Sequence, residues 1–335
     1  MTPRRSNAAI IIDDVARAAG ISTATVSRAF SRPHMLRPET VALVRKLADQ
    51  LGYQPNPAAR ALSTGRQGNI AIVLPDIANP FFPPLLRAAQ AAADAAGYSV
   101  FLGDSDENST REARLIGKLT MQVEGFILAS SRMTNRKIVE LGERQPVVLI
   151  NRDIPGLPRV LIDPAKGIGA AVEHLSQLGH KNIAYVSGPA ASWSNQQREY
   201  AVEKSCAKHK LRLRTLPIGH PDFESGREIT EKVLALKRVT AVITFDDSVA
   251  HGLLAGLAER GIDVPRALSV IGCDDVLGAS TYPALTSVSA RCDEAGRLAF
   301  ELLHKSLNDE GGDDIRSVLD TWLVARGTTG PARID

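Results

Sequence analysis

The chain has 335 residues, of which 44% are hydrophobic and 23% charged, and its formal net charge is +3 at pH 7. This length predicts about two or three domains, and no apolar run approaches the roughly 18 residues of a membrane span. The composition therefore indicates a soluble globular protein, and a first segment without a secretory signal predicts a cytoplasmic location. Three widely spaced cysteines, Cys206, Cys273 and Cys292, favour buried free thiols over a disulfide framework or a metal site.

The charge is unevenly distributed along the chain. Residues 1–66 carry ten Lys and Arg against four Asp and Glu, a net charge of +6, and the remaining residues carry a net charge of −3. A small basic head on a weakly acidic body predicts that the head alone binds a polyanion.

The head begins with VARAAGISTATVSRAF at residues 15–30. Apolar spacing predicts a helix that follows a cap at Asp13 or Asp14 and ends at residue 19, a second over 23–30 capped by Ser22, and a third over 38–51. Gly20 and Gly52 are the expected stops, and Pro38 is a favourable first-turn residue. The sequence thus predicts two short helices joined by a tight turn, followed by a third helix.

The outer face of the second helix has an unusual composition. Small hydroxyl residues and one arginine occupy it, whereas a solvated helix normally prefers Glu, Lys and Gln. Such a face suits base edges and phosphates in a DNA major groove.

The next segment, PNPAARALSTGRQG at residues 55–68, is rich in helix breakers. Its prolines and glycines leave about seven helix-prone residues, 58–64, which is below the roughly 12 to 15 at which an isolated helix becomes marginal. We expect this segment to be disordered unless a partner docks against it.

From Asn69 onward, short Val, Ile and Leu runs alternate with helical patterns. This alternation predicts parallel sheets covered on both faces, and the number of strands favours two doubly wound lobes over one sheet. Ligands then belong in the cleft between the lobes, at the carboxyl ends of the strands. The expected strands are 69–74, 99–103, 125–129, 146–150, 159–163, 182–188, 213–218, 241–245, 268–272 and 286–289; the expected helices are 82–96, 107–121, 135–142, 165–178, 195–209, 222–236, 247–260 and 292–307.

The chain resembles the lactose-repressor/galactose-repressor (LacI/GalR) family of transcription regulators from Ile12 to about Gly330. The segments that carry the resemblance are DVARAAGISTATVSRAF (14–30), LRPETVALVRKLADQLGYQPNPAARAL (36–62), IANPFF (77–82), GHKNIAYVSGP (179–189), FDDSVAHG (245–252) and LSVIGCDD (268–275). The resemblance implies an N-terminal all-α helix-turn-helix head over residues 1–57 and a hinge helix or linker over 58–68. It further implies an effector-binding and dimerisation domain over 69–335, an α/β body of two doubly wound lobes like the type I periplasmic binding proteins. Crossovers between the lobes are expected near 153–160, 278–286 and 319–324.

For DNA binding, the resemblance implies a recognition helix that begins at Ser22. Arg28 would reach a guanine, with a phosphate contact or a surface salt bridge as the alternative, and Leu62 of the hinge would enter the minor groove, with packing on the body as the alternative. The DNA-binding residues expected on this basis are Ser22, Thr23, Ala24, Thr25, Ser27, Arg28, Arg60 and Leu62.

For the effector, the resemblance implies a cleft lined by Phe81, Phe82, Asn151, Arg152, Trp193, Arg198, Asp246 and Asp274. Each follows a predicted strand or begins a helix, and aromatic faces together with charged hydrogen-bonding groups suit a polyhydroxylated ring. The family usually has asparagine where Asp246 stands, and this exchange replaces a donor-acceptor amide with a pure acceptor.

These features predict a transcription regulator, most often a repressor, that binds a palindromic operator in double-stranded DNA as a homodimer. A sugar or sugar alcohol is the favoured effector, because purine-responsive relatives have an arginine where this chain has Ser192; a nucleoside or purine is the alternative. A solute-binding carrier protein is the less favoured class. The chain has no GxSxG, HExxH or SxxK pattern, so no enzyme activity is expected, and neither a cofactor, a metal nor a membrane partner is expected.

Overall fold

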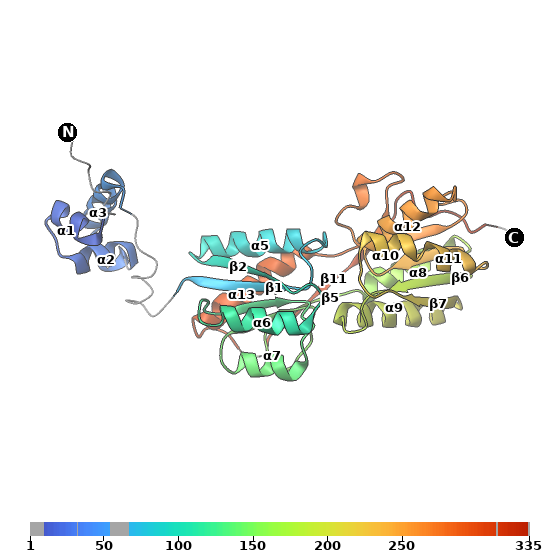
Figure 1. Ribbon diagram of the computed structural model, residues 1–335, viewed down its shortest axis with the longest axis horizontal. Coiled ribbons are helices and arrows are strands. Elements are labelled where there is room, and N and C mark those ends of the chain that lie inside the picture. Colours follow the sequence, from blue (N-terminus) through green and yellow to red (C-terminus); the bar gives the residue numbers. More distant parts are fainter. Residues whose placement is uncertain (1–9, 32, 54–66, 313, 334–335) are drawn as a thin grey trace, which may run out of the picture. The chain divides into compact units, whose positions relative to one another are not determined.

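The structure is a computed structural model that describes residues 10–31, 33–53, 67–312 and 314–333. The chain divides into two compact units, Met1–Gly68 and Asn69–Asp335, called here the head and the body. Over the described residues, no helix has the length and apolar character needed to cross a membrane. The ribbon is coloured along the sequence in Figure 1.

The head is a bundle of three helices, α1 (Ile12–Ala19), α2 (Thr23–Ser31) and α3 (Pro38–Leu51), with a short 3-10 turn, η1 (Pro33–Met35). One apolar residue pair from each helix forms its core: Val15 and Ala16, Val26 and Ala29, and Val44 and Ala48. The predicted stops at Gly20 and Gly52 are confirmed, since both have left-handed φ angles, of 66° and 70°. Gly20 thus ends α1 in the turn that leads to α2, and Gly52 ends α3.

The start of α1 differs from the prediction. Its N-cap is Ile11, so the predicted cap by Asp13 or Asp14 is wrong. The Asp14 carboxylate, in the first turn of the helix, instead accepts the backbone N–H of Ile11 at 3.1 Å. This bond satisfies a backbone donor that the helix itself cannot pair.

The first lobe of the body is a six-stranded sheet in the order β11-β5-β4-β3-β1-β2, with every neighbouring pair parallel. Its strands are β1 (Asn69–Leu74), β2 (Ser99–Asp104), β3 (Phe126–Ala129), β4 (Val147–Ile150), β5 (Arg159–Asp163) and β11 (Arg316–Asp320). Its helices are α5 (Phe82–Ala95), α6 (Ser109–Leu119), α7 (Asn135–Gly142) and α13 (Cys292–Leu307).

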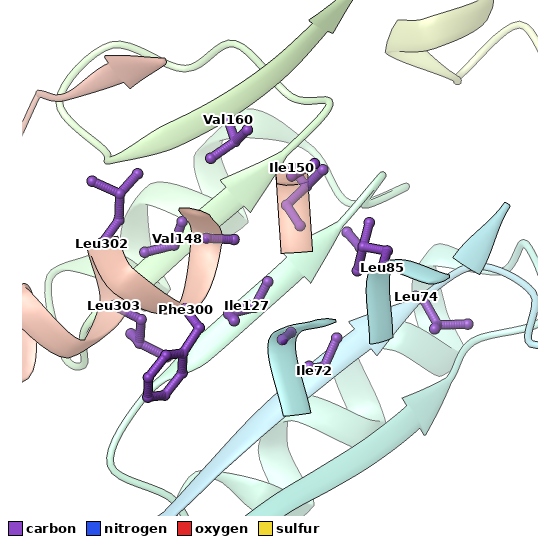
Figure 2. Packing of buried hydrophobic residues seen from close by; sticks show 14 of the residues in the cluster. Ile72, Leu74, Leu85, Ile127, Val148, Ile150, Val160, Phe300, Leu302 and Leu303 are labelled. Carbon is purple, nitrogen blue, oxygen red and sulfur yellow. The ribbon is translucent and has the colours of Figure 1, made fainter. Parts of the chain in front are cut away.

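Alternate residues of each strand in this lobe pack on opposite faces of the sheet. Ile72, Ile127 and Val148 belong to the cluster that α5 and α13 cover, and Figure 2 shows Ile127 and Val148 near Phe300 and Leu303 of α13. The alternate residues of the same strands pack with Ile116 and Ile138 of α6 and α7 on the other face, in the cluster of Ala71, Val73, Phe126, Leu128, Val147 and Leu149. Helices on both faces confirm the doubly wound prediction.

The second lobe has a six-stranded sheet in the order β12-β10-β9-β8-β6-β7, parallel except for the β10–β12 pair. Its strands are β6 (Asn182–Ser187), β7 (Arg212–Pro217), β8 (Ala241–Thr244), β9 (Ser269–Asp274), β10 (Thr286–Ser289) and β12 (Trp322–Val324). Its helices are α8 (Ala165–Gln177), α9 (Trp193–His209), α10 (Phe223–Glu228), α11 (Thr230–Ala235), α12 (Asp247–Glu259) and the 3-10 turn η2 (Gly278–Ser280). Helices α8 and α9 cover one face, α11 and α12 cover the other, and α10 packs against α12.

The chain crosses between the lobes three times, but two of the predicted crossover positions are wrong. Strands β4 and β5 pair in one sheet, so the chain crosses only at Pro164, after β5. Strands β9 and β10 also pair, which moves the second crossover to Ala290 and Arg291 before α13. The third prediction is confirmed, because Thr321 alone separates β11 of the first sheet from β12 of the second.

Candidate functional site

The outward face of α2 carries the residues that the sequence assigned to DNA. Ser22, Ala24 and Arg28 are exposed, and Thr23, Thr25 and Ser27 are half-exposed, whereas Val26 and Ala29 are buried in the head core. The arrangement places small polar groups and one guanidinium on the solvent side of a single helix, as groove entry requires. Arg60 and Leu62 lie outside the described residues.

Hydrogen bonds at the start of α2 fix two of these hydroxyl groups. The Ser22 Oγ accepts the Thr25 backbone N–H at 3.2 Å and lies 2.9 Å from the Thr25 Oγ1, so the predicted Ser22 cap is confirmed. Ser31, one turn after Ser27, donates its hydroxyl to the Ser27 carbonyl at 2.8 Å. The helix therefore begins with an ordered pair of hydroxyls next to its free backbone N–H groups, a favourable phosphate-binding geometry.

The body contains a small, partly open cavity between its two lobes. Both sheets contribute residues from the carboxyl ends of their strands: Pro75, Asn79, Phe81, Phe82, Glu107, Ser130, Arg132 and Asn151 from the first lobe, and Ser192, Ser194, Arg198, Pro221, Phe245, Asp246 and Asp274 from the second.

The centre of the second-lobe wall is an ion pair between Arg198 and Asp274. Their side chains are buried, and the Arg198 Nη2 lies 2.5 Å from the Asp274 Oδ1. Arg198 also donates to the Phe245 carbonyl, and its guanidinium lies 5.0 Å from the centre of the Phe245 ring. Burial lowers and Asp274 raises the pKa of Arg198, with a net increase, so the guanidinium stays charged.

Asp246 is the N-cap residue of α12 and a hydrogen-bond partner of the opposite lobe. One of its carboxylate oxygens accepts the Val249 backbone N–H, and the other accepts the Asn79 side-chain amide, both at 2.9 Å. Burial, and then the nearby Asp274 carboxylate, raise the pKa of Asp246 to about 7. Near neutral pH this group can therefore accept or donate a hydrogen bond.

Asp247, next to Asp246, belongs to the scaffold behind the cavity wall. Its carboxylate accepts the Ser287 hydroxyl at 2.6 Å and the Val276 backbone N–H at 3.1 Å. Burial, and then Asp274, raise the pKa of Asp247 to about 8. These bonds tie the start of α12 to β10 and to the loop after β9, and so fix the position of Asp246.

Several cavity residues have left-handed backbone conformations. Glu107, Ser130 and Asn151 have φ angles between 53° and 54°, and Asp274 has a φ of 102°. Each such residue costs of order 1 to 3 kcal/mol and persists only where surrounding contacts hold it. These four residues follow or end β2, β3, β4 and β9, and all of them line the same cavity.

The structure brings together six of the eight predicted effector residues: Phe81, Phe82, Asn151, Arg198, Asp246 and Asp274. Arg152 and Trp193 are not among the lining residues. Arg152 donates through Nη2 to the Met133 carbonyl and the Asn135 side chain, both at 2.9 Å, and Trp193 is the half-buried first residue of α9.

Three residues that line the cavity, Asn79, Glu107 and Arg132, were not predicted from the sequence. Asn79 lies inside the quoted segment IANPFF, Arg132 follows β3, and Glu107 lies between β2 and α6. The rule that ligands bind at the carboxyl ends of parallel strands would have found all three, because each lies just beyond a predicted strand.

Two family models match separate parts of the chain. Residues 11–56 match the family of bacterial regulatory proteins of the lacI type, and residues 172–329 match the periplasmic binding protein-like domain. Among solved structures, the chain is similar to a Lac repressor dimer bound to operator and the anti-inducer ONPF (TM-score 0.85, 24% identity, 96% of this chain and 100% of that one). It is also similar to a LacI family transcriptional regulator from Enterococcus faecium with bound ribose (TM-score 0.72, 26% identity, 79% of this chain and 100% of that one).

Among curated proteins, the chain is 33% identical to catabolite control protein A of Priestia megaterium over 313 residues, which cover 91% of this chain and 94% of that protein. It is 31% identical to the HTH-type transcriptional repressor CytR of Escherichia coli K12 over 337 residues, which cover 98% and 99% of the two chains. With such identity along nearly its whole length, the chain belongs to the lacI family of bacterial regulatory proteins, whose members are DNA-binding transcriptional regulators and not enzymes.

Proposed function

We propose that the protein is a transcriptional repressor that binds a palindromic operator as a homodimer and changes its DNA affinity when an uncharged sugar or sugar alcohol occupies the body cavity. The observation that carries this proposal is the wall formed by Arg198, Asp274 and Asp246. It presents buried charged donors and acceptors to the cavity, with the Arg198 guanidinium against the Phe245 ring.

The cavity chemistry favours a hydroxyl-rich ligand. Each sugar hydroxyl can donate to a carboxylate and accept from a guanidinium, and the apolar face of a sugar ring packs on an aromatic ring such as Phe81. Ser192, where an arginine would hold a purine, uses its side chain to accept the Asn195 backbone N–H at 3.3 Å. The cavity thus has no charged donor at that position, and the nucleoside alternative loses its main contact.

The hydrogen bond between Asn79 and Asp246 supplies a route from ligand to DNA. It joins the two lobes across the cavity at 2.9 Å, and both residues line the cavity. A ligand hydroxyl that donates a hydrogen bond to the Asp246 carboxylate would replace its bond from Asn79 and so change how the lobes close. Because a ligand shifts a two-state equilibrium only through differential contacts, this bond is a suitable place for the coupling.

A surface of the second lobe supports the dimer. A groove there is lined by apolar residues that include Phe223, Leu254 and Ile262, and Tyr282 at its edge is fully exposed. Contiguous exposed apolar surface of this kind marks protein interfaces, and a palindrome requires two heads held by one assembly.

The proposal is tested with the full-length protein and palindromic duplexes that it selects from a random DNA pool. We expect a complex of two chains per duplex by sedimentation, and calorimetric binding of at least one of ribose, xylitol, glucose or cellobiose that also changes the operator affinity. Binding of adenosine, cytidine or a free purine, with no binding of any sugar or polyol, would favour the nucleoside alternative. Binding of one chain per duplex would contradict the dimer.

Arg28→Ala is expected to relax base preference at one position of each operator half-site, at a cost of about 1 to 3 kcal/mol for the preferred base. The exposed Arg17 on α1 is the matched control, because its side chain pairs with Asp14 and lies on another helix. Arg17→Ala should weaken all sequences about equally. A DNA selection with each variant measures the preference, and an unchanged base profile for Arg28→Ala contradicts the base-reading role.

A further inference from the structure

The first lobe presents its own charged pair to the cavity. The Arg132 Nε and Nη2 donate to the two carboxylate oxygens of Glu107 at 2.5 and 2.8 Å, a bidentate arrangement, and both residues line the cavity. The Arg132 side chain is only 6% exposed. A buried bidentate pair holds a guanidinium in one orientation, which a surface arginine does not achieve.

The backbone around Arg132 is also held in place. The buried Glu112 of α6 accepts the Arg132 backbone N–H at 2.8 Å, and the Arg132 Nη1 donates to the Ser130 carbonyl at 2.6 Å. Ser130 and Glu107 both have left-handed φ angles. The loop after β3 and the loop before α6 are therefore fixed against each other around this one guanidinium.

Arg132 keeps part of its donor capacity for another partner. A guanidinium has five N–H groups, and three of them have acceptors in the described part of the chain. The other two belong to a side chain that lines the cavity. Arg152, which the family resemblance implied as the effector arginine of this lobe, donates instead to Met133 and Asn135, and it is not among the lining residues.

We infer that Arg132, oriented by Glu107, is the arginine through which the first lobe binds the effector, and that Arg152 does not contact it. This inference rests on the proposed function, because it assigns a recognition residue within the same cavity. Each of the two arginines, Arg132 and Arg198, already has a carboxylate partner, and Asp246 adds a further acid. The cavity therefore favours an uncharged hydroxyl-rich ligand over its phosphate or carboxylate derivative, which would meet these acids.

The test compares Arg132→Gln, Arg132→Lys and Arg152→Gln in the full-length protein, with Arg136→Gln as a control. Arg136 lies on α7 of the same lobe, and its exposed side chain pairs with Glu140. The probes are ribose, glucose and cellobiose, followed by ribose 5-phosphate and glucuronate, each measured by calorimetry. The unfolding midpoint of each variant shows whether its fold is intact.

We expect Arg132→Gln to weaken the sugar that the wild type binds best by about 10-fold or more, and Arg132→Lys to recover part of this loss. Arg152→Gln and Arg136→Gln should stay within about threefold of the wild type, and the anionic derivatives should bind at least about 10-fold more weakly than their neutral parents. Loss of binding in Arg152→Gln with retention in Arg132→Gln, or equal loss in both, overturns the inference alone. Failure of the wild type to bind any probe overturns the sugar proposal and this inference together.

Discussion

Arg198→Met is expected to lower the free energy of unfolding by about 3 to 5 kcal/mol at pH 8, because it leaves a buried carboxylate without its cation. Asp274 is paired with Arg198 at 2.5 Å, and it lies close enough to Asp246 to disfavour ionisation of that second acid. Effector binding should be lost in the same variant, since the guanidinium lines the cavity.

The loss of stability in Arg198→Met should shrink at low pH. Burial already raises the pKa of Asp274, and removing the arginine raises that pKa further. A carboxyl whose folded pKa exceeds its unfolded value of about 3.9 contributes stability that is complete at low pH and is lost as the pH rises through the folded pKa. Asp246 and Asp247, with pKa values raised to about 7 and about 8, impose the same trend on the wild type. The variant should therefore lose more stability than the wild type between pH 5 and pH 8.

Urea unfolding at pH 5 and pH 8 measures this difference, with fluorescence of Trp193 and Trp322 as the signal from the body. The double variant Arg198→Met with Asp274→Asn is the control, because it removes both charges and should recover much of the lost stability. A deficit that is equal at the two pH values, or a double variant no more stable than Arg198→Met, contradicts the buried-charge explanation.

The strands and helices with strong local patterns were predictable from the sequence. Strand 69–74 and helix 292–307 have the predicted bounds, because continuous Val, Ile and Leu runs and helical apolar spacing are local signals. The strands β11 and β12 were not predicted. β11 is largely exposed at the edge of its sheet, and β12 has three residues, so neither shows a buried apolar run.

Long-range arrangements were less predictable than the elements themselves. The expected helix over 222–236 is two short helices, α10 and α11. The crossovers near 153–160 and 278–286 were wrong because pairing between β4 and β5, and between β9 and β10, depends on contacts that no local pattern encodes.

The candidate site shows the same limit at the level of single side chains. Arg198, Asp246 and Asp274 line the cavity, and all three were predicted from the sequence. Arg132 and Arg152 each follow a strand of the first lobe, so both fit the strand-end rule. Only the partners Glu107, for Arg132, and Asn135, for Arg152, decide which guanidinium faces the cavity, and these pairings are tertiary contacts.

The second large loss of stability is expected from a substitution at Gly252, where α12 crosses α10. A Cβ added at Gly252 would lie 1.9 Å from the Phe223 carbonyl oxygen, and one added at Gly226 would lie 2.3 Å from the Val249 carbonyl oxygen. Both obstacles are backbone atoms, so the helices would have to move apart. Gly252→Ala should therefore lower the free energy of unfolding by roughly 3 kcal/mol, although alanine favours a helix by up to about 1 kcal/mol.

The displacement caused by Gly252→Ala should also reach the effector cavity. α12 begins directly after Asp246, whose bond to Asn79 joins the lobes, so a shift of α12 moves this carboxylate relative to the first lobe. We expect weaker sugar binding together with a lower urea midpoint. Gly117→Ala on the exposed side of α6 is the matched control, because a Cβ there meets nothing within 4 Å, and it should raise stability by about 0.5 to 1 kcal/mol. If Gly252→Ala is as stable as Gly117→Ala, the helices do not cross as closely as described. If it is destabilised but binds sugar normally, the crossing does not position Asp246.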